Sequence, residues 1–213
     1  MSKTAISLDS VYKKFNDSYV IEDLNFSFPS GETALLKGRN GIGKTTFFRL
    51  IAGVIKAQKG KIETMGGIPT QNKIRSLVNY MGPNDGFYEH LSAYENLTFF
   101  QKVFSSGKNF SRDSILKSVD LWESRNVATK NYSTGMKKRF ALAISMIRNS
   151  ELYLFDEPFK GLDDVGKEIL KGYLEKIKKE KKAIFIISNL FNDIEGFDSV
   201  YEMASSSVVK KIK

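Results

Sequence analysis

The stretch Gly38-Arg39-Asn40-Gly41-Ile42-Gly43-Lys44-Thr45 fits the pattern G-x-x-x-x-G-K-[ST] and indicates the fold of this chain. Glycines at these positions let the backbone N–H groups of a loop point inward at phosphate oxygens. Lys44 is then placed to reach the β- and γ-phosphates, and the Thr45 hydroxyl to coordinate Mg²⁺. An apolar segment, Thr33–Lys37, precedes the loop, and apolar residues at helical spacing follow it. The sequence therefore predicts a P-loop between a strand and a helix, with Mg-ATP as its expected ligand.

A second segment, Leu152–Glu157, supports this interpretation because it is an apolar strand that ends in two carboxylates. A carboxylate at the C-terminal end of a parallel strand points into the ligand crevice of an α/β sheet. Asp156 is predicted to hold Mg²⁺, directly or through water. Glu157 is predicted to orient or deprotonate the attacking water, as a general base does.

The order of the remaining segments favours the α/β class. Strand-helix-strand alternation around the P-loop predicts an α/β core, and the middle of the chain, from about residue 85 to 131, is predicted to be mainly helical. Ser92 with Glu95 fits a capping box, and Ser111 fits an N-cap. A helix is expected over Thr134–Asn149 and a hairpin over Ser199–Ile212. The expected strands before the hairpin are Leu8–Phe15, Val20–Phe28, Leu152–Phe155 and Ala183–Ile187.

Composition narrows the function classes. The 213 residues contain no cysteine and one histidine, which excludes disulfides and thiolate metal sites and leaves little scope for zinc chemistry. No signal-peptide core and no apolar run of about 18 residues is present, so an intracellular protein is expected. The net charge of +9 allows a nucleic-acid or anionic membrane partner. However, the lysines of Lys167–Lys182 alternate with apolar residues at helical spacing and are interpreted as a solvated face.

These motifs, in this order, resemble the ATP-binding subunit of an ATP-binding cassette (ABC) transporter, over nearly the whole chain. Tyr132-Ser-Thr-Gly-Met136 stands where that family has its Leu-Ser-Gly-Gly-Gln signature, shortly before the Walker B segment Leu152–Glu157. Gly161-Leu-Asp163 resembles the D-loop, and Val78–Leu97 resembles the region around the Q-loop.

The resemblance implies roles for single residues. Phe15 would stack on the adenine, and Ser133 and Gly135 would contact the γ-phosphate held by a second ABC subunit, in a homodimer or a heterodimer. The fold that the resemblance implies is a P-loop NTPase core of mainly parallel sheet, an N-terminal antiparallel β subdomain and a helical lobe at about residues 85–149, within a single domain of residues 1–213. The helical lobe would dock on separate transmembrane permease subunits, and the protein would then lie in the cytoplasm, peripheral at the inner face of the membrane. No nucleic-acid partner is expected. The residues expected to bind the phosphates of ATP are Gly38, Asn40, Gly41, Gly43, Lys44, Thr45 and Thr46.

Four positions depart from the family pattern. The signature has Thr134 where glycine is usual and Met136 where glutamine is usual. The Q-loop glutamine has no clear match, and Asn84 is the candidate that would offer an amide to Mg²⁺ or water. Asn189 stands in place of the switch histidine. Because Asn189 cannot become cationic, and charge-assisted hydrogen bonds are about twice as strong as neutral ones, ATP hydrolysis is expected to be slow or to depend on a partner.

Three functions remain open from the sequence. The first is the ATPase of an exporter-type transporter, since the residues after Asn189 leave no room for a regulatory domain. The second is a degenerate ABC module that binds ATP and dimerises with a regulatory role and little hydrolysis. The third is a cassette ATPase that acts on nucleic acid or ribosomes, which the positive charge suggests. The retained Lys44, Asp156 and Glu157 favour the first.

Overall fold

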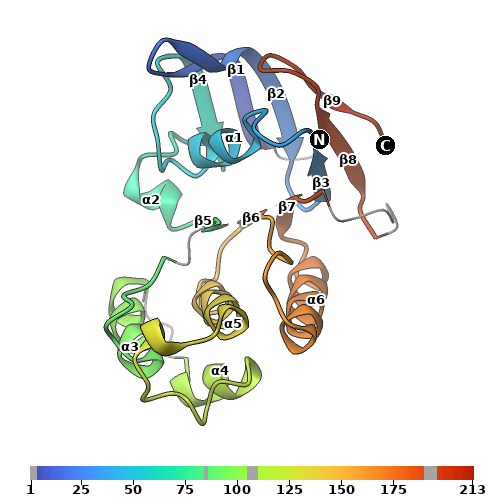
Figure 1. Cartoon of the computed structure of the whole chain (residues 1–213). Coiled ribbons are helices and arrows are strands. Elements are labelled where there is room, and N and C mark those ends of the chain that lie inside the picture. The colour runs from blue at the N-terminus through green and yellow to red at the C-terminus, as the bar shows by residue number, and fades with distance from the viewer. Residues whose placement is uncertain (1–3, 84–85, 105–109, 190–195) are drawn as a thin grey trace. The chain divides into compact units, whose positions relative to one another are not determined.

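The computed structural model describes residues 4–83, 86–104, 110–189 and 196–213 (Figure 1). Two compact units can be distinguished. The first contains residues 1–80, 150–158 and 177–213, and the second contains residues 81–149 and 159–176. Within the described part of the chain, no helix combines the length and the apolar composition needed to cross a bilayer.

The smaller sheet of the first unit has the strand order β2-β1-β4 and is antiparallel. Strands β1 (Thr4–Phe15) and β2 (Ser18–Pro29) form a hairpin whose turn contains Asn16 at a φ of 51°, a conformation that asparagine tolerates well. The predicted N-terminal antiparallel subdomain is therefore confirmed, with strands longer than expected. Strand β4 (Lys59–Thr64) was not predicted, because only its C-terminal end is buried and its pattern is weakly apolar.

The larger sheet has the order β5-β6-β7-β3-β8-β9. Pairs β3–β7, β3–β8 and β6–β7 are parallel, and only the β8–β9 hairpin among the pairs with a known direction is antiparallel. The central strands are continuous buried apolar runs, as parallel strands require. This confirms the mainly parallel core. The bounds are β5 Val78–Met81, β6 Leu152–Asp156, β7 Ala183–Ile187, β3 Thr33–Lys37, β8 Ser199–Met203 and β9 Val209–Lys211.

Helix α1 (Lys44–Ile51) packs in the same core as both sheets of the first unit (Figure 1). Its Phe47 ring meets Phe26 of β2 edge-on at 5.1 Å and Phe185 of β7 edge-on at 6.2 Å. Such edge-to-face pairs add about 0.5–1.5 kcal/mol beyond their buried area. The aromatic cluster thus fixes α1, and with it the loop that precedes α1. A short helix, α2 (Asn72–Arg75), follows β4.

The second unit is helical and has its own apolar core around Leu97, Leu116 and Phe140. The predicted capping box is confirmed: the Ser92 N–H donates to Glu95 at 2.8 Å, and the Glu95 N–H donates to the Ser92 hydroxyl at 3.2 Å. Ser111 caps α4 as expected. The bounds are α3 Ala93–Phe104, α4 Arg112–Ser118, η1 Thr129–Asn131, α5 Thr134–Met146 and α6 Asp164–Lys179.

Candidate nucleotide site

The P-loop connects β3 to α1 in the first unit, as the sequence predicts. Gly43 is the N-cap of α1 and has a φ of 116°, which L side chains rarely adopt. A Cβ at Gly43 would also lie 3.0 Å from the Val20 carbonyl oxygen, and one at Gly38 would lie 2.8 Å from that of Met203. The glycines are therefore required both by the backbone conformation and by close packing. Without a capping side chain, the first N–H groups of α1 stay available to an anion.

The Lys44 ammonium is buried and donates hydrogen bonds to the carbonyl oxygens of Gly38 at 2.6 Å and Arg39 at 3.0 Å. It therefore curls over the loop into which phosphates would fit. Burial lowers the pKa of Lys44, and the charges of Glu157 and Asp156 oppose that shift. An incoming phosphate would replace the two neutral carbonyl acceptors by charged ones, which form stronger bonds.

Asp156 ends β6 and is almost completely buried beside α1. Its carboxylate accepts a hydrogen bond from the Thr45 hydroxyl, so two of the three residues predicted to hold Mg²⁺ are in contact. Burial raises the pKa of Asp156, against the opposing effects of Thr45, Arg49 and Lys44. Burial makes the ionised form of this carboxylate unfavourable, and a cation in contact with it would remove that free-energy cost.

Two further side chains that the sequence analysis did not identify interact with Asp156, Tyr80 by contact and Arg49 through its charge. The Tyr80 hydroxyl lies 3.5 Å from Asp156 Oδ2, and Arg49 hydrogen-bonds that hydroxyl. Burial, with the charge of Asp156 as the second cause, raises the pKa of Tyr80 to about 12. Arg49 stands four residues after Thr45 on α1, so helical spacing offered a signal for it. Tyr80 comes from a different strand, and no local pattern indicates its contact.

Glu157 follows directly on β6 and has a φ of 54°, in the left-handed region that a non-glycine residue seldom occupies. Its N–H donates to the Ile187 carbonyl oxygen at 2.9 Å, which ties this turn to the end of β7. Such conformations cost about 1–3 kcal/mol and gather at functional sites. The strained turn is the structural feature that sets Glu157 apart from an ordinary acidic residue after a strand.

Asn189, the residue at the switch position, contacts the P-loop. Its side-chain amide donates to Asn40 Oδ1 at 2.9 Å, so these two predicted site residues lie together although 149 positions separate them. Thr46 lies in the first turn of α1. Phe15 ends β1 and is exposed, with the Lys13 ammonium 5.1 Å from its ring centroid. Its stacking role stays a prediction, and Asn84 lies outside the described residues.

The signature-like turn belongs to the second unit. Ser133 is the N-cap of α5 and accepts a hydrogen bond from the Met136 N–H at 3.2 Å. Ser133 and Thr134 are exposed at the start of this helix, where backbone N–H groups favour an anion. The Thr134 methyl lies 3.5 Å from the position of a Cβ built on Gly161, so the β-branched side chain contacts the loop before α6.

The donor set suits Mg²⁺ carried by a nucleotide. Among the described residues, no three His, Cys, Asp or Glu side chains cluster to bind a metal by themselves. Mg²⁺ is commonly bound by one or two protein oxygens together with substrate phosphates and water. The Asp156 carboxylate in contact with the Thr45 hydroxyl, next to the P-loop, provides that kind of partial shell.

Comparison with known proteins agrees with this geometry. The ATP-binding protein YhcH of Bacillus subtilis, described as an uncharacterized ABC transporter protein, is 30% identical over 196 residues, which cover 91% of this chain and 64% of YhcH. The bacitracin transport ATP-binding protein BcrA of Bacillus licheniformis is 32% identical over 195 residues, covering 90% of this chain and 64% of BcrA. The chain thus spans about two thirds of the length of these relatives.

A solved structure shares the fold. It is a dimeric, post-hydrolysis state of an ATP-binding cassette bound to ADP and Pi, with a TM-score of 0.85, 20% identity, and coverage of 98% of this chain and 99% of that one. The family model described as ABC transporter matches residues 21–160, which include the P-loop, the signature-like turn and the Asp156-Glu157 pair. This chain therefore belongs to the ABC transporter family.

Proposed function

We propose that this chain is the ATP-hydrolysing subunit of an ABC transporter and that it drives an exporter-type permease made of separate membrane subunits. The observation that carries the proposal is the group of residues in the first unit. Lys44 and the uncapped start of α1 are suited to phosphates, and Thr45 with Asp156 is suited to Mg²⁺. Bound Mg²⁺ would neutralise charge on the β- and γ-phosphates.

Hydrolysis is assigned to Glu157, which would accept a proton from the water that attacks the γ-phosphate. In the same proposal Asn189 donates a neutral hydrogen bond to that phosphate after leaving Asn40. Turnover is therefore slow compared with a site that contains a cationic histidine. BcrA, which is named for bacitracin transport, supports a role in transport.

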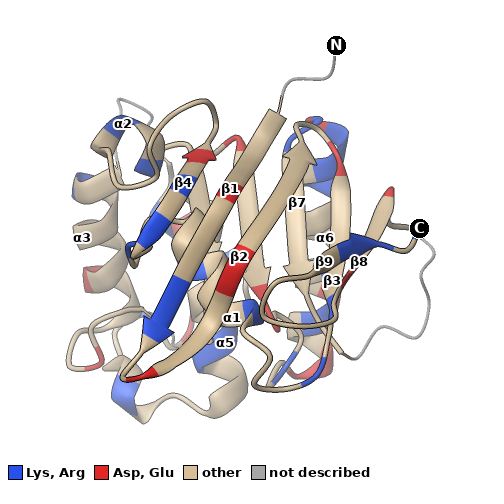
Figure 2. Cartoon of the chain, turned by 90° about the horizontal axis from the view of Figure 1, so that it is seen from above, with Lys and Arg blue, Asp and Glu red and all other residues tan. Residues whose placement is uncertain are grey.

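A dimer completes the site in this proposal. Ser133 and Gly135 are exposed or half-exposed at a helix start and would face the γ-phosphate on the partner's P-loop. The dimeric cassette with the same fold supports this assembly. The charge distribution gives less support to a nucleic-acid partner. Figure 2 shows Lys and Arg residues on several elements, and several of them form ion pairs with acidic residues, as in Lys61–Glu63, Lys171–Glu168 and Lys210–Glu202.

An exposed apolar surface on the second unit is the proposed permease contact. Tyr88, Phe99 and Val103 are 52%, 39% and 57% exposed, and the Tyr88 and Phe99 rings meet edge-on at 5.0 Å. Exposed aromatic groups of this kind mark protein contacts. Val103→Asp is expected to abolish co-purification with the membrane permease. Val54→Asp is the matched control, because Val54 is 55% exposed on the first unit.

Phosphate release by the purified protein, alone and with its permease, tests the main proposal. Lys44→Ala should remove ATP binding, and Glu157→Gln should retain ATP without releasing phosphate. If Glu157→Gln hydrolyses ATP as fast as the unmodified protein, Glu157 is not the catalytic carboxylate. The alternative, a degenerate module that binds ATP and dimerises with a regulatory role, rests on Thr134, Met136 and Asn189. It predicts ATP-dependent dimers with negligible phosphate release even when the permease is present.

A further inference from the structure

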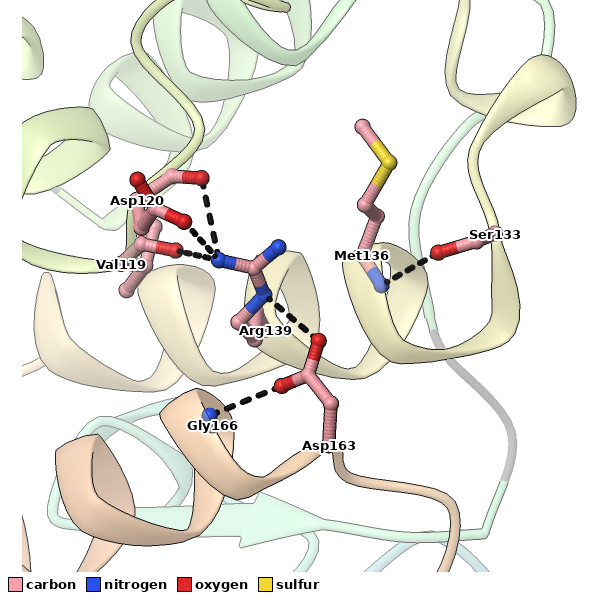
Figure 3. Close-up of polar contacts among 7 residues, drawn as sticks. All are labelled: Val119, Asp120, Ser133, Met136, Arg139, Asp163 and Gly166. Carbon is pink, nitrogen blue, oxygen red and sulfur yellow. Dashed lines mark hydrogen bonds and ion pairs between the residues drawn. The ribbon is translucent and has the colours of Figure 1, made fainter.

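A buried arginine lies one helical turn toward the C-terminus of α5 from the signature-like turn (Figure 3). Arg139 of α5 is buried, and its Nη1 donates to the carbonyl oxygens of Val119 at 3.2 Å and Asp120 at 3.0 Å. The same nitrogen lies 2.7 Å from Asp120 Oδ2. One end of the guanidinium is therefore fixed by three oxygens of the α4–η1 connection.

The other end of this guanidinium faces the loop before α6. Arg139 Nε lies 3.5 Å from Asp163 Oδ2 and makes no hydrogen bond, so the contact is an ion pair between a buried cation and a carboxylate that is 43% exposed. The second oxygen of Asp163 accepts a hydrogen bond from the Gly166 N–H at 2.8 Å. Asp163 therefore caps α6 and neutralises Arg139 at once (Figure 3).

Two glycines allow Asp163 to approach α5 so closely. A Cβ on Gly135 would lie 2.8 Å from Asp163 Oδ2, and a Cβ on Gly166 would lie 2.9 Å from Asp163 Oδ1 and 3.1 Å from the Arg139 Cγ. Gly135 and Arg139 are four residues apart, so they share one face of α5. A side chain at position 135 would therefore displace the Asp163 carboxylate of its own subunit from its place beside α5.

We propose that Arg139 and Asp163 are a positioning pair, which sets the orientation of the Ser133–Gly135 turn toward the nucleotide bound by the partner subunit. The inference rests on the proposed dimeric function. Neither side chain touches the reacting atoms. Arg139 fixes α5 to the α4–η1 connection, and Asp163 fixes the same helix to the start of α6. Loss of the pair in one subunit should therefore impair the site whose P-loop is in the other subunit.

Mixed dimers test this prediction. In the parent pair, one chain is unmodified and the other carries Lys44→Ala. The intact site then uses the P-loop of the unmodified chain and the signature-like turn of the Lys44→Ala chain. Asp163→Asn is introduced into either chain. It keeps the side-chain size and the acceptor for Gly166 but removes the negative charge opposite Arg139. Phosphate release and ATP-dependent dimer formation are measured, together with the Tm of each variant.

Asp163→Asn in the Lys44→Ala chain is expected to lower phosphate release roughly tenfold or more and to weaken the ATP-dependent dimer, since small misplacements of a reacting group have such effects. In the other chain it should change both less than about twofold. Asp164→Asn is the matched control. Asp164 is 98% exposed, pairs only with Lys167 at 2.8 Å, and should have no effect in either chain.

Equal losses in both arrangements, or a loss explained by a lower Tm, would overturn the positioning role while leaving the proposed function intact. A parent pair that neither binds ATP as a dimer nor releases phosphate would overturn the proposed function, and this inference with it. Arg139→Lys provides a second variant, because it retains the cation but not the planar set of donors. Arg139→Lys should lower phosphate release when it is in the Lys44→Ala chain and have little effect when it is in the other chain.

Discussion

At the scale of single residues, the buried carboxylate of Asp156 links stability to function. Its pKa is raised by burial, so the folded protein binds a proton at Asp156 more readily than the unfolded chain does. Below the unfolded pKa of about 3.9 the Asp156 carboxyl is protonated in both states, so it does not lower the free energy of unfolding. As the pH rises from there to the folded pKa, Asp156 lowers the free energy of unfolding by an increasing amount. Above the folded pKa this amount stays constant.

Asp156→Asn is therefore expected to raise the free energy of unfolding at neutral pH, with nucleotide and metal removed, and to lose this advantage in acid. Denaturant titrations at several pH values measure the effect. Mg²⁺-dependent ATP retention should be lost in the same variant. A less stable Asp156→Asn protein at neutral pH would show that Lys44, Arg49 and Thr45 more than compensate the burial of the charge.

Asn189 offers a second prediction at this scale, a gain of activity. Asn189→His would place a side chain that can become cationic next to Asn40 and the P-loop. A charge-assisted hydrogen bond to the γ-phosphate should raise the rate of phosphate release by roughly tenfold. The gain should shrink as the pH rises above about 6.5, the ordinary histidine pKa. Equal rates in Asn189→His, Asn189→Ala and the unmodified protein would show that this position does not limit hydrolysis.

At the scale of elements, the capping box of α3 is the clearest prediction. Ser92 and Glu95 satisfy each other's backbone N–H groups, and the Ser92 hydroxyl also bonds Glu95 at 2.8 Å. Ser92→Ala should lower the free energy of unfolding by about 1 kcal/mol. Urea unfolding measures this, and Ser114→Ala, which keeps the backbone donor of the α4 cap, serves as a control. An unchanged midpoint would mean that packing alone maintains α3.

Helices and strands differ in how well they could be predicted from the sequence. The strands β3, β6 and β7 could be predicted because buried parallel strands are continuous apolar runs, and the helix caps because their signals are local. Strand β4 was not predicted because only its C-terminal end is buried, and β5 was not predicted because it has only four residues. The P-loop, Asp156 and Glu157 could be predicted because their motifs are local in sequence. The contacts of Tyr80 with Asp156 and of Arg139 with Asp163 could not, because each joins residues that are distant in sequence.

At the scale of the whole molecule, the proposed function requires two chains for one site. Lys44 lies in the first unit and Ser133 in the second, and each has its own local support. A chain with Lys44→Ala keeps an intact signature-like turn, and a chain with Ser133→Glu keeps an intact P-loop. In the proposed dimer the introduced glutamate would repel the γ-phosphate of the partner's nucleotide, whereas the Ser133 hydroxyl would donate a hydrogen bond to it.

Neither variant alone should form a dimer in ATP, because every site in such a dimer lacks either the lysine or the serine. An equal mixture should form dimers that retain one ATP for each pair of chains, since the P-loop of the Ser133→Glu chain meets the intact turn of the Lys44→Ala chain. Placing Glu157→Gln in both chains slows hydrolysis, so that light scattering and bound-nucleotide analysis can detect the complex. If the mixture retains no more ATP than either variant alone, Ser133 does not act on the partner's nucleotide, and each chain would have to bind ATP without a contribution from its neighbour.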